Sequence, residues 1–275
     1  MSQEVMVKKN AYVGLFMVAL STLMYEILLT RIFSVTLWYH FAFVAISIAM
    51  FGITVGAILV YLFPNYFTQE RAMHQLALSS LLFAVSIVIS FLTHLSIPFI
   101  TGQSNVFLYS IALTYAVISV PLVFSGTCVC LALTKFPKQV SKLYAADLTG
   151  AALGCLLIIY TLKITDGPTA VIVVALLASI GAFFFAVGGN YNKLMRITVI
   201  SSFLLASFAF FHTVLVNKQL PLLRLVWVKG GVEPRPLYEK WNSFSRIGVW
   251  GDPNIPQEPF GWGLSSTYLS DRKVR

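Results

Sequence analysis

Seven long apolar runs dominate the chain and leave few folds open to it. Each run is long enough, or nearly so, to cross a hydrocarbon layer about 30 Å thick, which takes roughly 20 helical residues. None shows the alternating pattern of a transmembrane β-strand, and a backbone in lipid must satisfy its own hydrogen bonds. We therefore predict an all-α membrane protein, a bundle of about seven transmembrane helices. The runs cover residues 11–36, 40–63, 74–98, 107–133, 144–163, 169–187 and 195–214.

Composition supports lipid as the solvent of this fold. Of 275 residues, 58% are hydrophobic and 11% are charged, and the mean hydropathy is +0.82. Soluble domains are about 45–50% apolar and about 25% charged. A water-soluble fold of this length has no interior large enough to hide so much apolar surface.

The basic residues indicate topology more than nucleic-acid binding. The net charge is +9, but Lys and Arg are scattered over short loops and the tail instead of being gathered on one face. Counted over alternate loops, eight basic residues fall on one side and Lys163 on the other, which is a positive-inside bias. We expect a multi-pass protein of the cell (inner) membrane with a cytoplasmic N-terminus. The eight are Lys8, Lys9, Arg71, Lys135, Lys138, Lys142, Lys193 and Arg196.

The texture changes after residue 214, which divides a transmembrane domain (1–214) from a soluble tail (215–275). The tail is rich in Pro, Gly and aromatic residues, with short β-like pieces at Leu222–Val228 and Arg246–Trp250. Its sixty residues are too few to bury a sizeable core alone, so we expect the start of an incomplete domain. Seven spans would place it outside, although it is itself basic; either it lies outside or the spans number six or eight.

Three ionisable residues inside the apolar runs form a candidate intramembrane polar site. Glu26 and Arg31 lie in the first run, where a charged side chain costs from about 2.5 kcal/mol upwards. Glu26 is either a cation or proton site or a hydrogen-bond partner between helices, and Arg31 can reach the nearby interface. Asp147 opens the fifth helix, as a helix-start residue or a second cation ligand. Topology argues against its meeting Glu26.

Two small-residue patterns predict close helix packing. Gly52 and Gly56 lie one turn apart in the second run, and Gly150 and Gly154 lie one turn apart in the fifth. Small residues at this spacing let helix backbones approach closely in lipid. We interpret both pairs as packing seams.

No metal or nucleotide site is indicated. The four histidines are spread over three runs without ligand spacing, and Cys128-x-Cys130 has no second pair. Neither a phosphate-binding loop nor a dinucleotide fingerprint occurs between a strand and a helix.

Three stretches together resemble one family. They are YEILLTRIFS (residues 25–34), YAADLTGAALG (144–154) and YEKWNSFSRIGVW (238–250). Together they resemble the membrane-embedded spermidine synthase-like proteins, in which a multi-span domain precedes a polyamine aminopropyltransferase-type domain. The third stretch is similar to the entry into the synthase half. The matching positions there are Trp241, Asn242, Ser243, Ser245 and Arg246.

The resemblance implies a catalytic domain that this sequence does not carry. The family's domain has a Rossmann-like methyltransferase fold and binds decarboxylated S-adenosylmethionine through a Gly-rich loop and acidic residues. After residue 215 the only aspartates are Asp252 and Asp271, and neither follows a Gly-rich strand end. No catalytic or cofactor-binding residue carries over, and we expect the chain to be inactive alone.

Two functions are open on this basis. The first is a membrane-anchoring or regulatory module for a spermidine synthase-like domain, on the same or a separate chain. The second is a multi-span carrier of a small cationic or polyamine-like solute, using Glu26, Arg31 and Asp147. The expected partners are the lipid bilayer and a catalytic domain or chain, and no nucleic acid.

Overall fold

The computed structural model describes residues 9–37, 39–98, 105–252 and 254–255. In these ranges, seven helices are long and apolar enough to cross a membrane, which confirms the predicted helical bundle. Short 3-10 turns η1 (Tyr39–Phe41) and η2 (Pro137–Gln139) precede the second and fifth helices. The seven are α1 (Lys9–Thr36), α2 (Ala42–Leu62), α3 (Ala72–Ser96), α4 (Asn105–Lys135), α5 (Val140–Ile164), α6 (Gly167–Gly189) and α7 (Asn192–Asn217).

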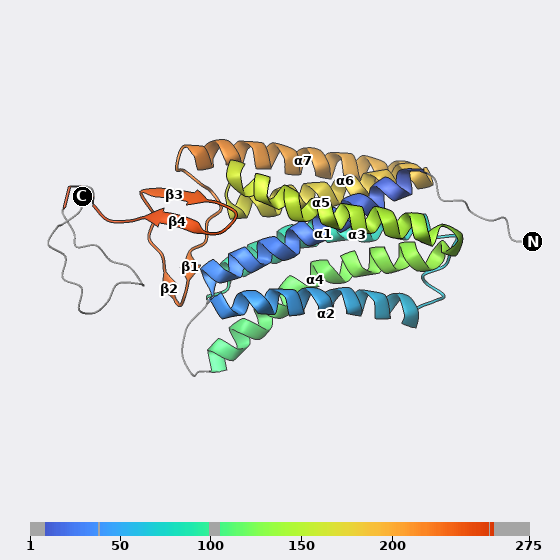
Figure 1. Ribbon diagram of the computed structural model, residues 1–275, viewed down its shortest axis with the longest axis horizontal. Helices are drawn as coiled ribbons and strands as arrows, with labels where there is room; N and C mark the ends of the chain where they lie inside the picture. The colour runs from blue at the N-terminus through green and yellow to red at the C-terminus, as the bar shows by residue number, and fades with distance from the viewer. Residues whose placement is uncertain (1–8, 38, 99–104, 253, 256–275) are drawn as a thin grey trace, which may run out of the picture.

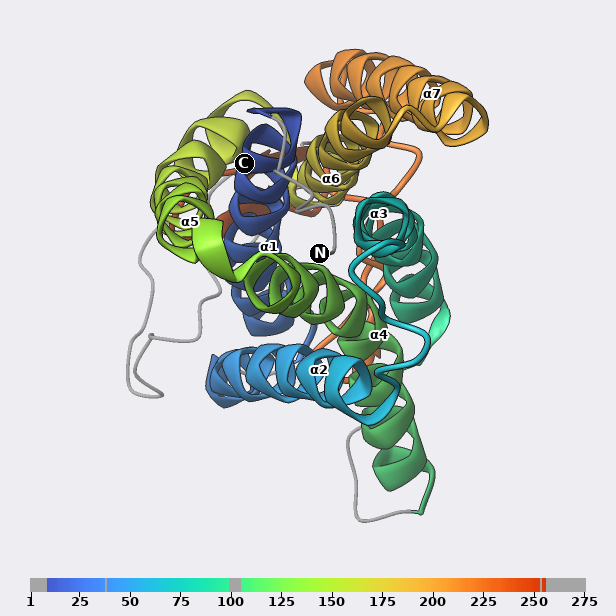
Figure 2. The ribbon, with the colours of Figure 1, turned by 90° about the vertical axis from the view of Figure 1, so that its right-hand side faces the viewer.

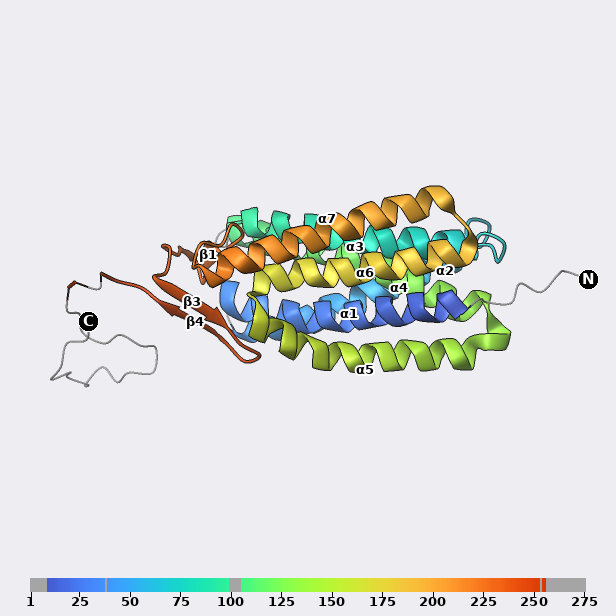
Figure 3. The same ribbon diagram turned by 90° about the horizontal axis from the view of Figure 1, so that it is seen from above.

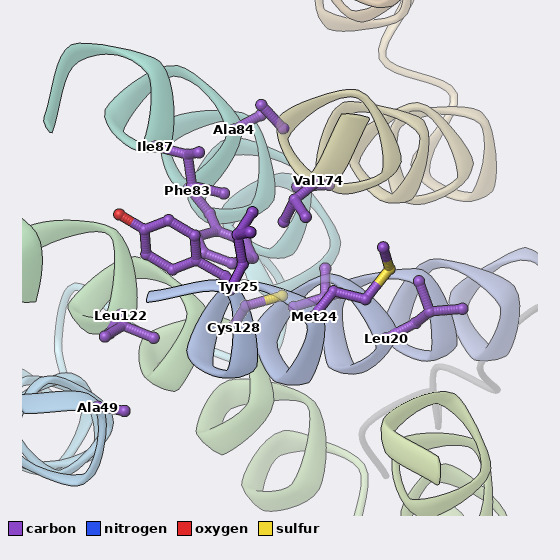
Figure 4. Close-up of a cluster of buried hydrophobic side chains, with 14 of the residues drawn as sticks. Leu20, Met24, Tyr25, Ala49, Phe83, Ala84, Ile87, Leu122, Cys128 and Val174 are labelled. Atoms are coloured by element: carbon purple, nitrogen blue, oxygen red, sulfur yellow. The ribbon is translucent and has the colours of Figure 1, made fainter. Parts of the chain in front are cut away.

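Helix α1 lies at the centre of the bundle. It packs against α2, α4, α5 and α6, while α3 lies against α4 and α6 on the far side (Figure 2). The core therefore gathers around α1. Tyr25 of α1 meets Phe83 of α3 edge to face at 6.5 Å between ring centroids. Figure 4 shows this pair with Cys128 of α4 and Val174 of α6.

The glycine pairs lie where helices approach most closely. Gly52 and Gly56 of α2 face the backbone of α4, and Gly150 and Gly154 of α5 face Phe16 and Leu20 of α1. A Cβ at Gly56 or Gly150 would overlap a carbonyl oxygen of the neighbouring helix. Because contacts advance in the same direction along α1 and α5, these two helices run parallel.

Helix α7 is the outermost helix and packs on α6 (Figures 1 and 2). Only Thr198, Ala209 and His212 of α7 are buried. Hydroxyl groups bond along the α6–α7 contact. Ser202 donates to Ser179 at 3.0 Å, the Ser179 hydroxyl donates to the Thr198 carbonyl at 3.4 Å, and near the other end Thr165 and Thr213 share a bond of 3.1 Å.

The tail forms two small antiparallel hairpins at the end of the bundle opposite the N-terminus (Figures 1 and 3). Strand β1 (Trp227–Val228) pairs with β2 (Gly231–Val232), and β3 (Tyr238–Trp241) pairs with β4 (Arg246–Val249). In the second hairpin Trp241 lies opposite Arg246. Helix α7 continues to Asn217, three residues beyond the expected boundary at 214.

The expected β-like piece at Leu222–Val228 is wrong for its first five residues. Strand β1 begins only at Trp227. The backbone N–H groups of Leu222 and Leu223 donate to a ring nitrogen of His212 instead of to a neighbouring strand. The second piece, Arg246–Trp250, corresponds to β4.

Candidate functional site

A polar cluster joins α6, α7 and the tail at one end of the bundle. Asp166 caps the N-terminus of α6, where its Oδ1 accepts from the backbone N–H of Thr169 at 2.9 Å and from the Thr169 hydroxyl. The Thr169 hydroxyl lies 2.6 Å from Nδ1 of His212, whose side chain is fully buried. We call Asp166, Thr169 and His212 the tail-docking cluster.

The hydrogen bonds of His212 assign its tautomer. Its Nε2 accepts from the backbone N–H groups of Leu222 at 3.1 Å and Leu223 at 2.9 Å, so this nitrogen carries no proton. The proton of the neutral ring therefore sits on Nδ1, which donates to the Thr169 oxygen. Thr169 in turn donates to Asp166. Each polar group of this buried series has a partner: Nε2 of His212 holds the tail, and Nδ1 links the ring to α6.

Asp166, at the end of this series of hydrogen bonds, remains an acceptor near neutral pH. Burial raises the pKa of Asp166 to about 6, while the hydrogen bonds from Thr169 act in the opposite direction. At neutral pH the carboxyl is therefore ionised. It can accept both bonds from Thr169, so the helix cap and the docking contact depend on the same side chain.

Two further contacts fix the tail to the bundle. The backbone N–H of Lys229 donates to the carbonyl of Thr36, at the end of α1, at 2.8 Å. Trp241 is 3% exposed, and its ring packs on Gly167 so closely that a Cβ there would lie 2.9 Å from the ring. The tail thus contacts α1, α6 and α7 at separate points.

A buried ion-pair network holds the second hairpin. Arg246 donates from Nε to Oε1 of Glu239 and from a terminal nitrogen to Oε2, both at 2.9 Å, and it pairs with Glu233 at 2.6 Å. The Arg246 side chain is only 4% exposed. Trp241 adds a bond from Nε1 to Oε1 of Glu239 at 2.8 Å. This geometry is bidentate, which strengthens the Arg–carboxylate contact.

The charges of the network favour the ionised forms of Glu239 and Arg246. Burial by itself would raise the pKa of Glu239, but the hydrogen bonds and charge of Arg246 outweigh it and lower this pKa below its usual value. For Arg246, burial by itself would lower the pKa, but the two carboxylates raise it. An acid whose pKa falls on folding adds stability above its ordinary value of about 4.3. That stability is lost as the pH drops through the lowered pKa.

The five positions on which the resemblance to the spermidine synthase-like family depends in the tail form the tip of this hairpin. Trp241 and Arg246 are its last paired residues, and Asn242 closes the turn by accepting from the backbone N–H groups of Phe244 at 2.8 Å and Ser245 at 2.7 Å. Asparagine makes such turns readily because its side chain mimics a backbone carbonyl. The motif is therefore explained locally as a turn with a buried ion pair.

A second candidate site is a cleft between α1, α2 and α5, of about 480 Å³, which we call the lateral cleft. Glu26, Thr30 and Arg31 of α1 line it, and Ser243 and Phe244 of the hairpin tip lie at its edge. The remaining lining is mostly apolar. It consists of Leu23, Ile27, Ile46, Cys155, Ile158, Ile159 and Leu162.

The three predicted intramembrane charges are not brought together. Glu26 and Arg31 border the same cleft, although they are five residues apart on α1. Asp147 is on α5, eight residues and thus about 12 Å along the helix from Cys155, and it is absent from the cleft lining. The expected position of Asp147 at the start of the fifth helix is wrong, because α5 begins at Val140 and Asp147 lies about two turns inside it.

Several residues of the docking cluster escaped the sequence reasoning. The stretch Asp166-Gly167-Pro168 is typical of a turn. Asp166 followed three residues later by Thr169, with proline in the first turn, is also typical of a capped helix start. His212 gave no signal, because its partners are 43 and 10 residues away along the chain. In the described ranges, no three His, Cys, Asp or Glu side chains are placed to hold a metal ion.

Comparisons with known protein families, with curated proteins and with solved structures gave no match.

Replacing Arg246 with glutamine should loosen the second hairpin. The change leaves Glu233 and Glu239 without the cation that they share. The folded hairpin should lose about 3 kcal/mol of stability. Hydrogen exchange of amides in β3 and β4 should rise, measured by mass spectrometry on the full chain in nanodiscs. Lys240→Gln is the matched control, since Lys240 is an exposed basic residue of the same hairpin. Equal exchange in both variants would contradict a structural role for the network.

Proposed function

We propose that this chain is a multi-pass membrane protein whose tail holds a spermidine synthase-like catalytic domain against one face of the bilayer. The domain is carried on the same polypeptide or on a separate chain. The observation that carries the proposal is the three-point docking of the tail on α1, α6 and α7. A tail that only tethered a catalytic domain flexibly would need no such contacts, whereas a tail that holds the domain in a fixed orientation would need them.

The docking contacts favour a fixed orientation. The hairpin that resembles the start of the synthase half is tied by its Trp241 to the first turn of α6 and by its strands to a buried ion-pair network. Whatever the hairpin binds takes its orientation from the bundle. This supports presentation of a domain at the membrane surface more than a loose linkage.

The proposed orientation puts the N-terminus in the cytoplasm and the tail on the opposite side. The described tail lies at the far end of the bundle from the N-terminus (Figure 1). The basic loop residues such as Arg71 and Lys193 belong to the N-terminal end by connectivity. The positive-inside rule then favours a cytoplasmic N-terminal end.

A capture experiment tests both parts of the proposal. Right-side-out and inside-out membrane vesicles containing the full chain are mixed with a purified spermidine synthase-like domain from the same genome. We expect capture by right-side-out vesicles and reduced capture with Arg246→Gln. His74→Leu, at the opposite end of the bundle, should capture like the unaltered chain.

Two results would count against the proposal. Capture by inside-out vesicles alone would place the tail in the cytoplasm and overturn the orientation. Capture no greater than that of vesicles lacking the chain, in either orientation, would overturn presentation itself.

A carrier of a small cationic or polyamine-like solute is the second candidate. The lateral cleft favours it, because Glu26 and Arg31 offer polar groups within the bilayer. The cleft is lined by the C-terminal half of α1, however, and it does not reach Asp147. A transport path needs access from both sides, so we rank this function below presentation.

A further inference from the structure

The lateral cleft lies at the depth where a phospholipid changes from headgroup to acyl chain. Arg31 is five residues, or about 8 Å along the axis, from the end of α1 at Thr36, and Glu26 is about 15 Å from it. For a helix of 28 residues centred on a hydrocarbon layer about 30 Å thick, Arg31 falls close to the layer's edge. The apolar lining extends deeper.

The cleft contains two ionisable side chains, Glu26 and Arg31, that form no ion pair within the part of the chain that the structure describes. The Nε of Arg31 is buried and has no hydrogen-bond acceptor, and in the described part of the chain no carboxylate pairs with this guanidinium. Glu26 lies in the same cleft, and no ion pair joins it to Arg31 among the described residues. A buried guanidinium nitrogen without an acceptor is costly, so this site favours an anionic ligand on Arg31.

The shape of the cleft favours an amphiphile. Helix α1 supplies the floor, and residues of α2 and α5, which lie on different sides of α1, supply the walls (Figure 2). Below Arg31 the lining is mostly apolar and includes Leu23, Ile158 and Ile159, which suit a hydrocarbon chain. A free inorganic anion would use only the upper part of this volume.

We propose that the lateral cleft binds one membrane glycerophospholipid, with its phosphodiester on Arg31 and one acyl chain along α1, α2 and α5. The guanidinium presents donors that match two phosphate oxygens. Glu26 lies below this level, and its carboxyl in the protonated form can donate a hydrogen bond to a carbonyl of the glycerol ester region. Ser243 and Phe244 of the hairpin tip then border the headgroup. This inference does not depend on the catalytic domain proposed above.

Native mass spectrometry of the full chain in mild detergent tests the proposal, with dioleoyl phosphatidylglycerol as the probe. We expect one lipid to bind more tightly than the rest. Arg31→Gln should weaken that single event about tenfold, because a charge-assisted hydrogen bond is lost. Lys163→Gln is the matched control, since Lys163 is a basic residue at the same end of the neighbouring helix but does not line the cleft.

Two further variants separate binding from folding. Arg31→Lys keeps the charge and should bind within a few-fold of the unaltered chain. Cys155→Trp fills the cleft from α5 and should weaken binding while leaving Arg31 in place. Normal binding by Cys155→Trp would overturn the placement of the acyl chain. Equal loss in Arg31→Gln and Lys163→Gln would show only non-specific lipid contact and would overturn the site.

Competition with inorganic phosphate distinguishes the two sources of the anion. Phosphate at the concentration of the lipid should leave the tight lipid in place, because it cannot use the apolar part of the cleft. Displacement of the lipid by phosphate would show a site for a free anion and would overturn the lipid assignment.

Discussion

Leucine in place of His212 should release the tail from the bundle while the helices stay folded. The variant leaves the N–H groups of Leu222 and Leu223 and the oxygen of Thr169 without their ring partner. Each buried polar group left without a partner destabilises the docked state by about 1 kcal/mol or more, so docking of the tail should be weakened by about 3 kcal/mol. Amides in residues 218–228 should then exchange about a hundredfold faster, measured by hydrogen-exchange mass spectrometry in nanodiscs.

The control for this experiment is His74→Leu. His74 is an exposed histidine at the other end of the bundle, where its ring lies 5.0 Å from that of Tyr191. We expect no change in tail exchange for this variant. Unchanged exchange in His212→Leu, or faster exchange throughout the seven helices, would contradict the docking function of the imidazole.

A single methyl group at Gly150 should separate α5 from α1. The Cβ of Gly150→Ala would overlap the carbonyl oxygen of Phe16, and a backbone atom cannot turn aside as a side chain can. The helices must move apart, and overpacking of this kind costs about 3 kcal/mol. The melting temperature of the chain in detergent should fall by several degrees, measured by intrinsic fluorescence or circular dichroism.

Gly188→Ala provides a matched control, because it is also a buried glycine within a helix of the bundle. Its Cβ would meet the terminal methyl of Met73, which can rotate away. We expect a change of melting temperature close to zero. A similar fall of the melting temperature in both variants would show that an added methyl group is tolerated poorly at any buried glycine. It would contradict a specific role for the close α1–α5 contact.

Much of the helical architecture was predictable from the sequence, because runs of about 20 apolar residues permit few alternatives in lipid. The glycine pairs pointed to helix contacts, but they did not identify the partner helices. Gly126 of α4, whose Cβ would meet the backbone of Ile53, lies outside any GxxxG pattern and was missed. Its importance depends on which residue faces it, and sequence spacing does not contain that information.

The docking cluster was harder to predict than the bundle. Asp166 and Thr169 are local to one helix start, so a capping rule finds them. His212 and the amides of Leu222 and Leu223 meet only because the chain turns back after α7. The lateral cleft likewise needs three helices and the hairpin tip in place. The sequence shows that Glu26 and Arg31 are ionisable residues within an apolar run, but it does not show which residues surround them.

The hydroxyl bonds between α6 and α7 have a consequence for how the protein responds to bilayer thickness. Hydrogen bonds between helices are directional, so they fix the position of one helix along the other. The bond at Ser179 lies far along the two helices from the bonds at His212 and Thr213, so any sliding of α7 along α6 breaks the bonds at both levels together. A thinner or thicker membrane should therefore tilt the two helices as one unit, and the tail attached to their ends should tilt with them.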